Sequence, residues 1–266
     1  MKYVSYERDG LRSIGVFVDG RVFDIPGGAR SFGSKGMANT MLDFLDDFRE
    51  NHKEVTGMLD QISPAKRPEL YFPSGQASLL APLPNPRSLR LFVAFRTHKR
   101  SLFDFFSIPS TESDSDSPAF WFGNHQAIYG PGQKIVRPES TEQLDFGMSV
   151  AVIIGKEGHS IPADDAHNHI AGYTILNHWA ARDVQRANLQ QGFWSVKGAD
   201  FATSFGPYLV TKDEVSPAQG DEQLRLRMDV MISGNNYGSD NTSNMDFSFA
   251  EMIELASRDC TLYPGD

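Results

Sequence analysis

Residue types that commonly do chemistry are sparse in this chain, which has one cysteine and seven histidines among its 266 residues. The single cysteine, Cys260, excludes an intrachain disulfide framework and a cysteine-rich zinc site. No nucleophile motif surrounds Cys260, so we expect it to pack as a small hydrophobic side chain. Four of the histidines lie in loop-like polar contexts, and we assign them no role: His125, His159, His167 and His169.

The stretch LDFGMSVAVIIG, from Leu144 to Gly155, begins with the alternation of a half-buried strand. One face is apolar and is made by Leu144, Phe146, Met148 and Val150. The opposite face has Asp145, Gly147 and Ser149, and the last two have very small side chains. After Asp145, the polar face of this strand therefore carries almost nothing where the strand enters the protein interior.

The elements that would position these residues begin with a small N-terminal unit. The stretch SIGVFVDGRVFDI predicts a hairpin around Asp19 and Gly20. A helical stripe follows between Met41 and Ile62, and Gly57 inside it weakens the case for one unbroken helix. The segment Pro64–Pro86 holds six prolines and is predicted to be a linker.

From Arg87 onward the pattern favours strands, with short helices at Ala180–Ala187 and Phe249–Ser257. We therefore predict a mainly β (α+β) protein with two domains, 1–75 and 86–266. The polar, acidic stretch Ser107–Phe120 is either a surface loop or a lid. The predicted strands are IVRP, MSVAVIIG, HIAGYTILN, GPYLVT, LRLRMDVMISG and CTLY.

Composition excludes several classes of partner. The net charge is −9 and no dense Lys/Arg run is present, which argues against nucleic acid and anionic membranes. The longest apolar runs are too short to cross a bilayer. The N-terminal MKYVSYERDG has no apolar signal region, so the expected location is cytoplasmic.

Five motifs in order resemble the fumarylacetoacetate hydrolase family, over about Pro86 to Asp266. They are GPGQKIVRP, LDFGMSVAVIIGKEG, IAGYTILNHWAARDVQ, KGADFATSFGPYLVT and SRDCTLYPGD. The resemblance implies a mixed β-roll with a small N-terminal α/β domain, a homodimer, and a small diketo or 2-oxo substrate. It also implies Mg²⁺ held by acidic residues. Family members continue beyond the position of TLYPGD, so the C-terminal end of the roll is expected to be incomplete.

The positions that match the family's acidic metal ligands are occupied here by Leu91, Gly147, Ser149 and His178. Mg²⁺ and Ca²⁺ prefer oxygen ligands, mostly carboxylates, and an imidazole suits softer metals. One imidazole and one hydroxyl do not replace the carboxylates. The sequence therefore predicts that no metal cofactor binds.

Other positions of the family pattern are retained. Arg182 and Gln185 match residues that line the substrate pocket, and Lys197 matches a lysine that polarises a substrate oxygen. His98 matches the catalytic histidine, although Ser101 replaces the glutamate that pairs with it in smaller members. The resemblance thus implies His98, His178 and Lys197 as catalytic candidates and Arg182 and Gln185 as substrate ligands. Each also has a plain structural interpretation, as a surface histidine, a buried spacer, a solvated lysine or an ion pair.

Three functions remain open from the sequence. The first is a metal-independent enzyme that isomerises, cyclises, dehydrates or cleaves a C–C bond in a small oxo compound, in specialised metabolism. In it, Lys197 and Arg182 would hold an enolate or carboxylate and a histidine would move the proton. The second is a metal-dependent C–C hydrolase of the fumarylacetoacetate or acylpyruvate type. The third is a pseudoenzyme that binds a ligand or partner without turning it over.

Overall fold

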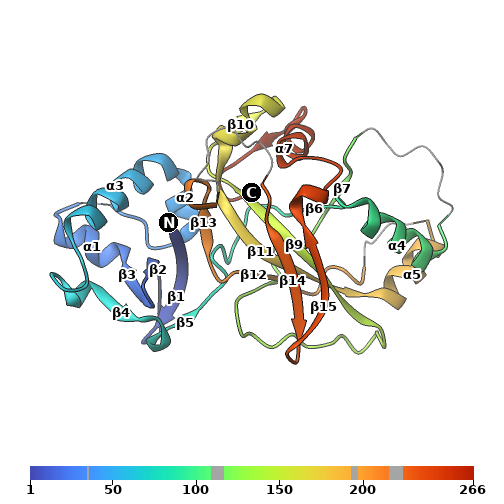
Figure 1. Cartoon of the computed structure of the whole chain (residues 1–266), viewed down its shortest axis with the longest axis horizontal. Helices are drawn as coiled ribbons and strands as arrows, with labels where there is room; N and C mark the ends of the chain where they lie inside the picture. The colour runs from blue at the N-terminus through green and yellow to red at the C-terminus, as the bar shows by residue number, and fades with distance from the viewer. Residues whose placement is uncertain (35, 109–116, 193–196, 216–223) are drawn as a thin grey trace.

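One sheet extends from the N-terminal part of the molecule into the larger C-terminal part (Figure 1). The computed structural model describes residues 1–34, 36–108, 117–192, 197–215 and 224–266. Within these residues ten strands form the sheet, in the order β4-β3-β2-β1-β13-β11-β12-β8, with β5 added to β1 and β9 added to β11. The strands are β1 (Lys2–Arg8), β2 (Leu11–Val18), β3 (Arg21–Asp24), β4 (Tyr71–Pro73), β5 (Ser78–Leu79), β8 (Ile128–Tyr129), β9 (Leu144–Ile154), β11 (Ile170–Ala181), β12 (Thr203–Phe205) and β13 (Leu209–Thr211).

Nearly all pairing in this sheet is antiparallel, and only β8 and β12 pair in parallel. A mainly β, mixed α+β fold is therefore confirmed. Three further strand pairs lie beside the sheet: β6 (Arg90–Phe92) with β7 (Phe120–Phe122), β10 (Gly158–His159) with β16 (Thr261–Leu262), and β14 (Arg227–Ile232) with β15 (Asn235–Asn241). The described helices are α1 (Ile25–Ser31), α2 (Met41–Asp46), α3 (Phe48–Gln61), α4 (Arg96–Phe106), α5 (Arg182–Gln190), α6 (Lys212–Val215) and α7 (Phe249–Ser257), with short 3-10 turns η1 (Pro68–Leu70), η2 (Ser74–Gln76), η3 (Ala163–His169) and η4 (Thr242–Asn244).

The N-terminal part is a small α/β unit, as predicted. Asp19 and Gly20 both have positive φ, at 47° and 77°, which is the geometry of a two-residue hairpin turn between β2 and β3. The predicted helix over 41–62 is divided in two, because Asp47, with φ −130° and ψ 46°, leaves the helical region between α2 and α3. Gly57, in contrast, lies inside α3 without breaking it.

The proline-rich segment is not the simple linker that its composition suggested. Its strands β4 and β5 pair with β3 and β1 and so extend the N-terminal part of the sheet. Pro73 ends the edge strand β4, where a missing N–H costs no ladder hydrogen bond, and the other five prolines lie outside the strands. IVRP is not a strand either, and the helix expected to begin at Ala180 begins at Arg182.

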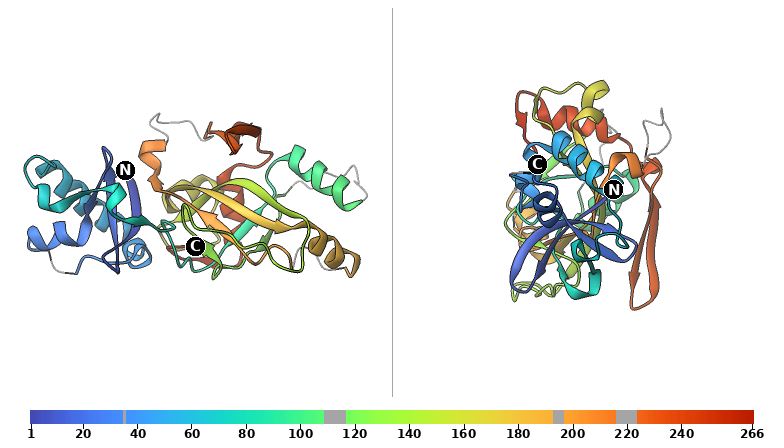
Figure 2. Two further views of the ribbon diagram at one scale, coloured as in Figure 1. Left: turned by 90° about the horizontal axis from the view of Figure 1, so that it is seen from below. Right: turned by 90° about the vertical axis from the view of Figure 1, so that its left-hand side faces the viewer.

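The two parts of the chain share a core. Tyr3 on β1 pairs with Leu209 on β13, and both belong to the same cluster of buried residues as Ile153 and Ala171 of the C-terminal part. Seen from below, the sheet continues from the N-terminal unit into the larger part (Figure 2). Burial of one apolar surface from both sides stabilises their packing together. The domain boundaries predicted from the sequence stay a prediction.

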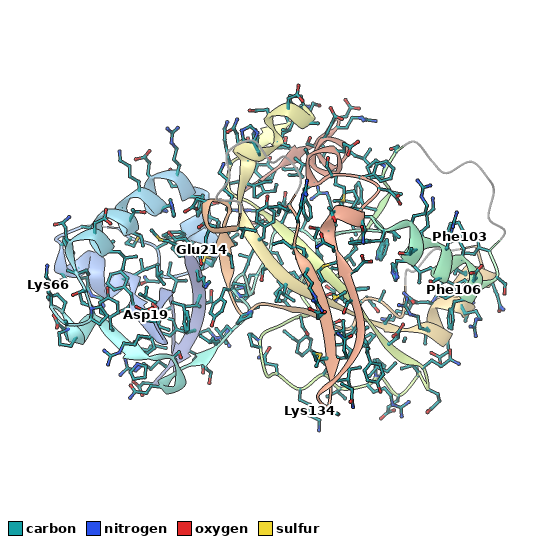
Figure 3. All side chains as sticks on the ribbon, in the orientation of Figure 1. Asp19, Lys66, Phe103, Phe106, Lys134 and Glu214 are labelled. Atoms are coloured by element: carbon teal, nitrogen blue, oxygen red, sulfur yellow. The ribbon has the colours of Figure 1, made fainter. Side chains whose placement is uncertain are left out.

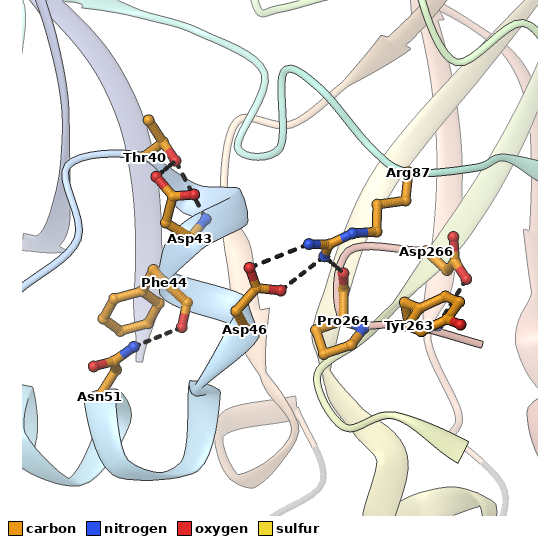
Figure 4. A network of polar contacts seen from close by, with 9 residues as sticks. All are labelled: Thr40, Asp43, Phe44, Asp46, Asn51, Arg87, Tyr263, Pro264 and Asp266. Atoms are coloured by element: carbon orange, nitrogen blue, oxygen red, sulfur yellow. Dashed lines mark hydrogen bonds and ion pairs between the residues drawn. The ribbon is translucent and has the colours of Figure 1, made fainter. Parts of the chain in front are cut away.

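Polar contacts also join the two parts. The guanidinium of Arg87 lies 2.8 Å from the Asp46 carboxylate of α2 and donates to the Pro264 carbonyl near the C-terminal end of the sequence (Figure 4). Glu214 on α6 lies at the same junction (Figure 3), where its carboxylate pairs with the Lys2 ammonium at 3.2 Å. The helix α2 lies at the opposite end of the larger part from α4 and α5 (Figure 1).

Three smaller predictions can be compared with the fold. Cys260 is exposed, so its expected packing as a small hydrophobe is wrong. His169 is buried rather than in an open loop, with Nδ1 3.0 Å from the Lys156 carbonyl and Nε2 3.2 Å from Asp165. Residues 109–116 of the candidate lid lie outside the described residues. Of the described helices, none has the length and apolar character to cross a membrane.

Candidate active site

A cavity of about 380 Å³ lies where β6, β9 and β11 meet the helices α4, α5 and α7. Its walls are mostly apolar, with phenylalanine or methionine side chains from β6, β9, α4 and α7. His98, His178, Arg182 and Gln185 line it too, so four of the five predicted site residues come together there. The helices α4 and α5 lie next to each other at the far end from the N-terminal unit (Figures 1 and 2), and Phe103 and Phe106 mark this end in Figure 3.

The two faces of β9 have different surroundings, and these account for the unusual mixture of large apolar and very small side chains along this strand. Val150 and Val152 pack against the apolar cluster that contains Ile253 of α7. The other face carries Gly147 and Ser149, which stand directly opposite His178 and Leu176 of β11. Residues directly opposite in an antiparallel pair share a face. The small side chains therefore leave space on the cavity side of the strand, next to His178.

Arg182 is held at the junction where β11 passes into α5. Its backbone N–H donates to the Gln143 carbonyl at 2.9 Å, and its side chain is 14% exposed. Nε donates to Asp145 of β9 at 2.7 Å, and Nη1 donates to the Gln185 side chain at 3.0 Å. The third nitrogen, Nη2, has no hydrogen-bond partner among the described residues. The guanidinium is thus oriented from two sides and keeps one nitrogen for a ligand.

His98 lies in the first turn of α4 and lines the cavity. The ring is exposed, yet the protein around it removes part of its hydration. This desolvation, followed by the positive charge of Arg182, lowers the pKa of His98, and Asp145 partly opposes the shift. At neutral pH the imidazole is therefore uncharged and can accept a proton next to an arginine that can stabilise the resulting negative charge on a substrate.

His178 is more deeply enclosed. Burial, followed by the charge of Arg182, lowers the pKa of His178 to about 4. Its Nδ1 lies 3.4 Å from the Thr203 hydroxyl, whereas Nε2 is shielded from solvent and has no hydrogen-bond partner among the described residues. The ring lies edge-on to Trp121, with the ring centroids 6.2 Å apart. His178 is therefore a neutral polar group in an apolar wall.

The residues at the family's ligand positions do not fit a hard divalent cation. Leu91 and Gly147 have no side-chain oxygen, Ser149 has a neutral hydroxyl, and His178 offers only a nitrogen. No cluster of three or more His, Cys, Asp or Glu side chains suited to a metal occurs in the described part of the chain. Mg²⁺ keeps its water shell unless carboxylates replace it, so this donor set is too weak.

Lys197 is the one predicted site residue that the structure does not bring to the cavity. Its side chain is 70% exposed and its ammonium pairs with Asp200 at 2.6 Å. Its role in catalysis stays a prediction. The sequence interpretation missed two residues that line the cavity, Trp121 and Arg90, and also Asp145, which binds Arg182. Asp145 could have been noticed as the only charge on the polar face of β9, whereas nothing in FWF or in SLRLF distinguishes Trp121 or Arg90.

The lowered pKa of His178 predicts a pH dependence of stability. In the unfolded chain an imidazole binds a proton near pH 6.5, whereas folded His178 stays neutral down to about pH 4. Between these values the unfolded state takes up a proton that the folded state lacks, so stability falls as pH falls from 6.5 towards 4. The His178→Leu variant should lose this part of the dependence, about 2–3 kcal/mol in the free energy of unfolding at pH 4 relative to pH 7. Urea denaturation of both proteins across this range measures it, and parallel curves would contradict the shift.

The family is shown by a match to the model described as fumarylacetoacetate (FAA) hydrolase C-terminal, over residues 88–266. The chain therefore belongs to the fumarylacetoacetate hydrolase family, as the motifs predicted. Among curated relatives, it is 32% identical over 194 residues to the oxaloacetate tautomerase YisK of Bacillus subtilis. That match covers 72% of this chain and 60% of the relative. It is 36% identical over 140 residues to the mitochondrial oxaloacetate tautomerase FAHD2A of Bos taurus, covering 53% of this chain and 43% of the relative.

Solved structures support the fold. A maleylpyruvate hydrolase from Sphingobium sp. SYK-6, in complex with manganese(II) and pyruvate, superposes with a TM-score of 0.73 at 21% identity. The alignment covers 100% of this chain and 86% of that one. A putative HpcE protein from Mycobacterium smegmatis superposes with a TM-score of 0.75 at 22% identity, covering 100% and 84%. At these identities the likeness concerns the fold.

Proposed function

We propose that this protein is an enzyme that moves a proton on a small diketo or 2-oxo compound bound in the cavity, without a metal ion. The observation that carries the proposal is the pairing of a neutral imidazole, His98, with the fixed guanidinium of Arg182 on the same cavity. Curated relatives named as oxaloacetate tautomerases make keto–enol interconversion the reaction class with the best support.

The chemistry follows from these two side chains. The imidazole of His98 accepts a proton from the carbon next to the carbonyl, and the C–H electron pair forms the C=C bond of an enolate. The negative charge moves to the carbonyl oxygen, where the positive charge of Arg182 stabilises it. The imidazolium of His98 then returns the proton to that oxygen, which completes the enol. Gln185 and Asp145 act on the arginine, because they hold its plane in place.

The donor set at the ligand positions supports metal independence. The solved structures do not add to this support, because the maleylpyruvate hydrolase of similar fold is in complex with manganese(II). Grafting the family's ligands tests it, with the changes Gly147→Glu, Ser149→Glu and His178→Asp in one protein. A Cβ at 147 would lie 3.7 Å from the His178 carbonyl oxygen and 3.9 Å from its Cβ, which are ordinary contacts. We expect stoichiometric Mn²⁺ or Mg²⁺ binding by calorimetry in the graft and none in the unmodified protein. Stoichiometric binding by the unmodified protein would contradict the proposal.

Tautomerisation of oxaloacetate in the presence of EDTA is the direct test of function. The loss of the enol absorbance and the deuterium exchange at C3 by NMR should both be accelerated by the protein. Pyruvate and phenylpyruvate complete a panel that samples short and bulky 2-oxo acids. No acceleration with any of the three, together with measurable binding, would favour the binding-only alternative.

The binding-only alternative has one observation in its favour. Arg182 already pairs with Asp145, and Lys197 pairs with Asp200 away from the cavity. The protein itself therefore partly neutralises both cationic side chains that match the family pattern. By analogy with the family, we also propose that the protein forms a homodimer. Size-exclusion chromatography with light scattering measures its mass in solution.

A further inference from the structure

The cavity contains polar atoms that the protein itself leaves without partners. Four buried side-chain nitrogen or oxygen atoms have no hydrogen-bond partner among the described residues, and three of them belong to residues that line the cavity. These are Arg90 Nε, Trp121 Nε1 and His178 Nε2. Buried polar groups are almost always paired in folded proteins, because an unpaired one loses its hydration without gaining a partner. Their concentration in one place indicates that the cavity is completed by a ligand.

Two of these atoms belong to neighbouring side chains. Trp121 and His178 lie edge-on, with ring centroids 6.2 Å apart, and both residues line the cavity. Trp121 Nε1 can only donate a hydrogen bond, and His178 Nε2 donates or accepts according to the tautomer. Both nitrogens are shielded from solvent, so one oxygen atom of a ligand pairs with both only when the two rings turn towards it. A ketone oxygen would accept from both, and an enol or phenol hydroxyl would accept from Trp121 and donate to His178.

The surroundings select a neutral oxygen over a carboxylate. Trp121 packs in an apolar cluster with Leu91, Leu176 and Phe205, so a charge placed beside its ring would lose hydration. The remaining cavity wall is apolar and aromatic, which suits a hydrocarbon body.

From these observations we infer that Trp121 and His178 form a binding site for one neutral oxygen, a ketone, enol or phenol oxygen, on a ligand with an apolar body. The inference deepens the proposed function, on which it rests only for the identity of the substrate, because within the panel of 2-oxo acids it favours phenylpyruvate, whose body is apolar. The region that holds acidic metal ligands in the family would thus, in this chain, bind an uncharged oxygen atom of the ligand.

The test compares two probes that differ by a single hydroxyl, 4-ethylphenol and ethylbenzene, with the full-length protein and NMR or calorimetric titration. The measured quantity is the ratio of the dissociation constant of ethylbenzene to that of 4-ethylphenol. In Trp121→Phe and in His178→Leu this ratio should fall by about tenfold, because the hydroxyl loses a partner. Trp179→Phe is the matched control: Trp179 Nε1 donates to Ser204 at 2.9 Å and does not line the cavity, so the ratio should stay unchanged.

Ethylbenzene affinity reports whether the cavity is intact in each variant, since this probe needs no hydrogen bond. His178→Leu should also leave the ligand-free protein at least as stable at pH 7, because it removes an unpaired buried atom. An unchanged ratio in both cavity variants overturns the inference, and so does native protein that binds neither probe. Neither probe can be turned over, so failure here is separate from failure of the oxaloacetate assay, which tests the proposed function.

Discussion

Replacing His98 with glutamine is expected to slow proton exchange at C3 of oxaloacetate by about a hundredfold or more, since general base catalysis contributes roughly 10²–10⁴. Glutamine keeps the approximate size and polarity of the side chain but cannot accept the proton. The binding of oxaloacetate, measured by calorimetry, should change little, because Arg182 and the cavity walls remain. The loss should therefore appear in kcat rather than in KM.

The pH profile of the native rate provides a second readout for His98. Desolvation and the charge of Arg182 lower its pKa, so the base remains neutral below pH 6.5 and the rate should begin to fall only under that value. In His98→Gln this acid limb should disappear from the residual rate. The matched control is His125→Gln, an exposed histidine that does not line the cavity. Equal rates in the two variants would place the base elsewhere.

Replacing Arg182 with lysine is expected to raise KM for oxaloacetate about tenfold or more and to lower kcat/KM about a hundredfold. An ammonium cannot bond Asp145, Gln185 and a ligand in one plane, as the guanidinium fork can. Removing an oriented donor to a developing oxyanion typically costs about 2.7–4 kcal/mol. Steady-state kinetics in EDTA measure both parameters.

Two further variants test whether the expected changes in KM and kcat/KM are specific to Arg182. Arg186→Lys, one turn further along α5, changes a guanidinium that lies 4.4 Å over the ring of Phe105 and does not line the cavity. It should remain close to native. Arg90→Lys tests the other arginine of the cavity, which lies 3.8 Å from Asp266. If Arg90→Lys raised KM and Arg182→Lys did not, Arg90 rather than Arg182 would hold the substrate.

Local sequence signals determined much of the framework. The turn at Asp19–Gly20 and the helix Phe249–Ser257 were predicted correctly, because both depend on short-range preferences. The helix begins at a Ser248–Glu251 capping box, in which each side chain accepts from the other residue's N–H. The strand Leu144–Ile154 was recognised from its alternation. The absence of carboxylates at 147, 149 and 178 was also plain from the sequence, because a missing ligand needs no coordinates to be noticed.

Tertiary structure alone decided how the polar groups combine. Asp145 and Arg182 are far apart in sequence, and only the pairing of β9 with β11 and the start of α5 at Arg182 bring Nε within 2.7 Å of the carboxylate. Trp121 meets His178 because β7 lies against β6 beside the sheet. Lys197 points away from the cavity to Asp200, although its motif matches the family. Motifs specify residue types along the chain, whereas pKa shifts, unpaired atoms and the shape of a cavity arise from contacts between distant segments, so only the packed fold determines them.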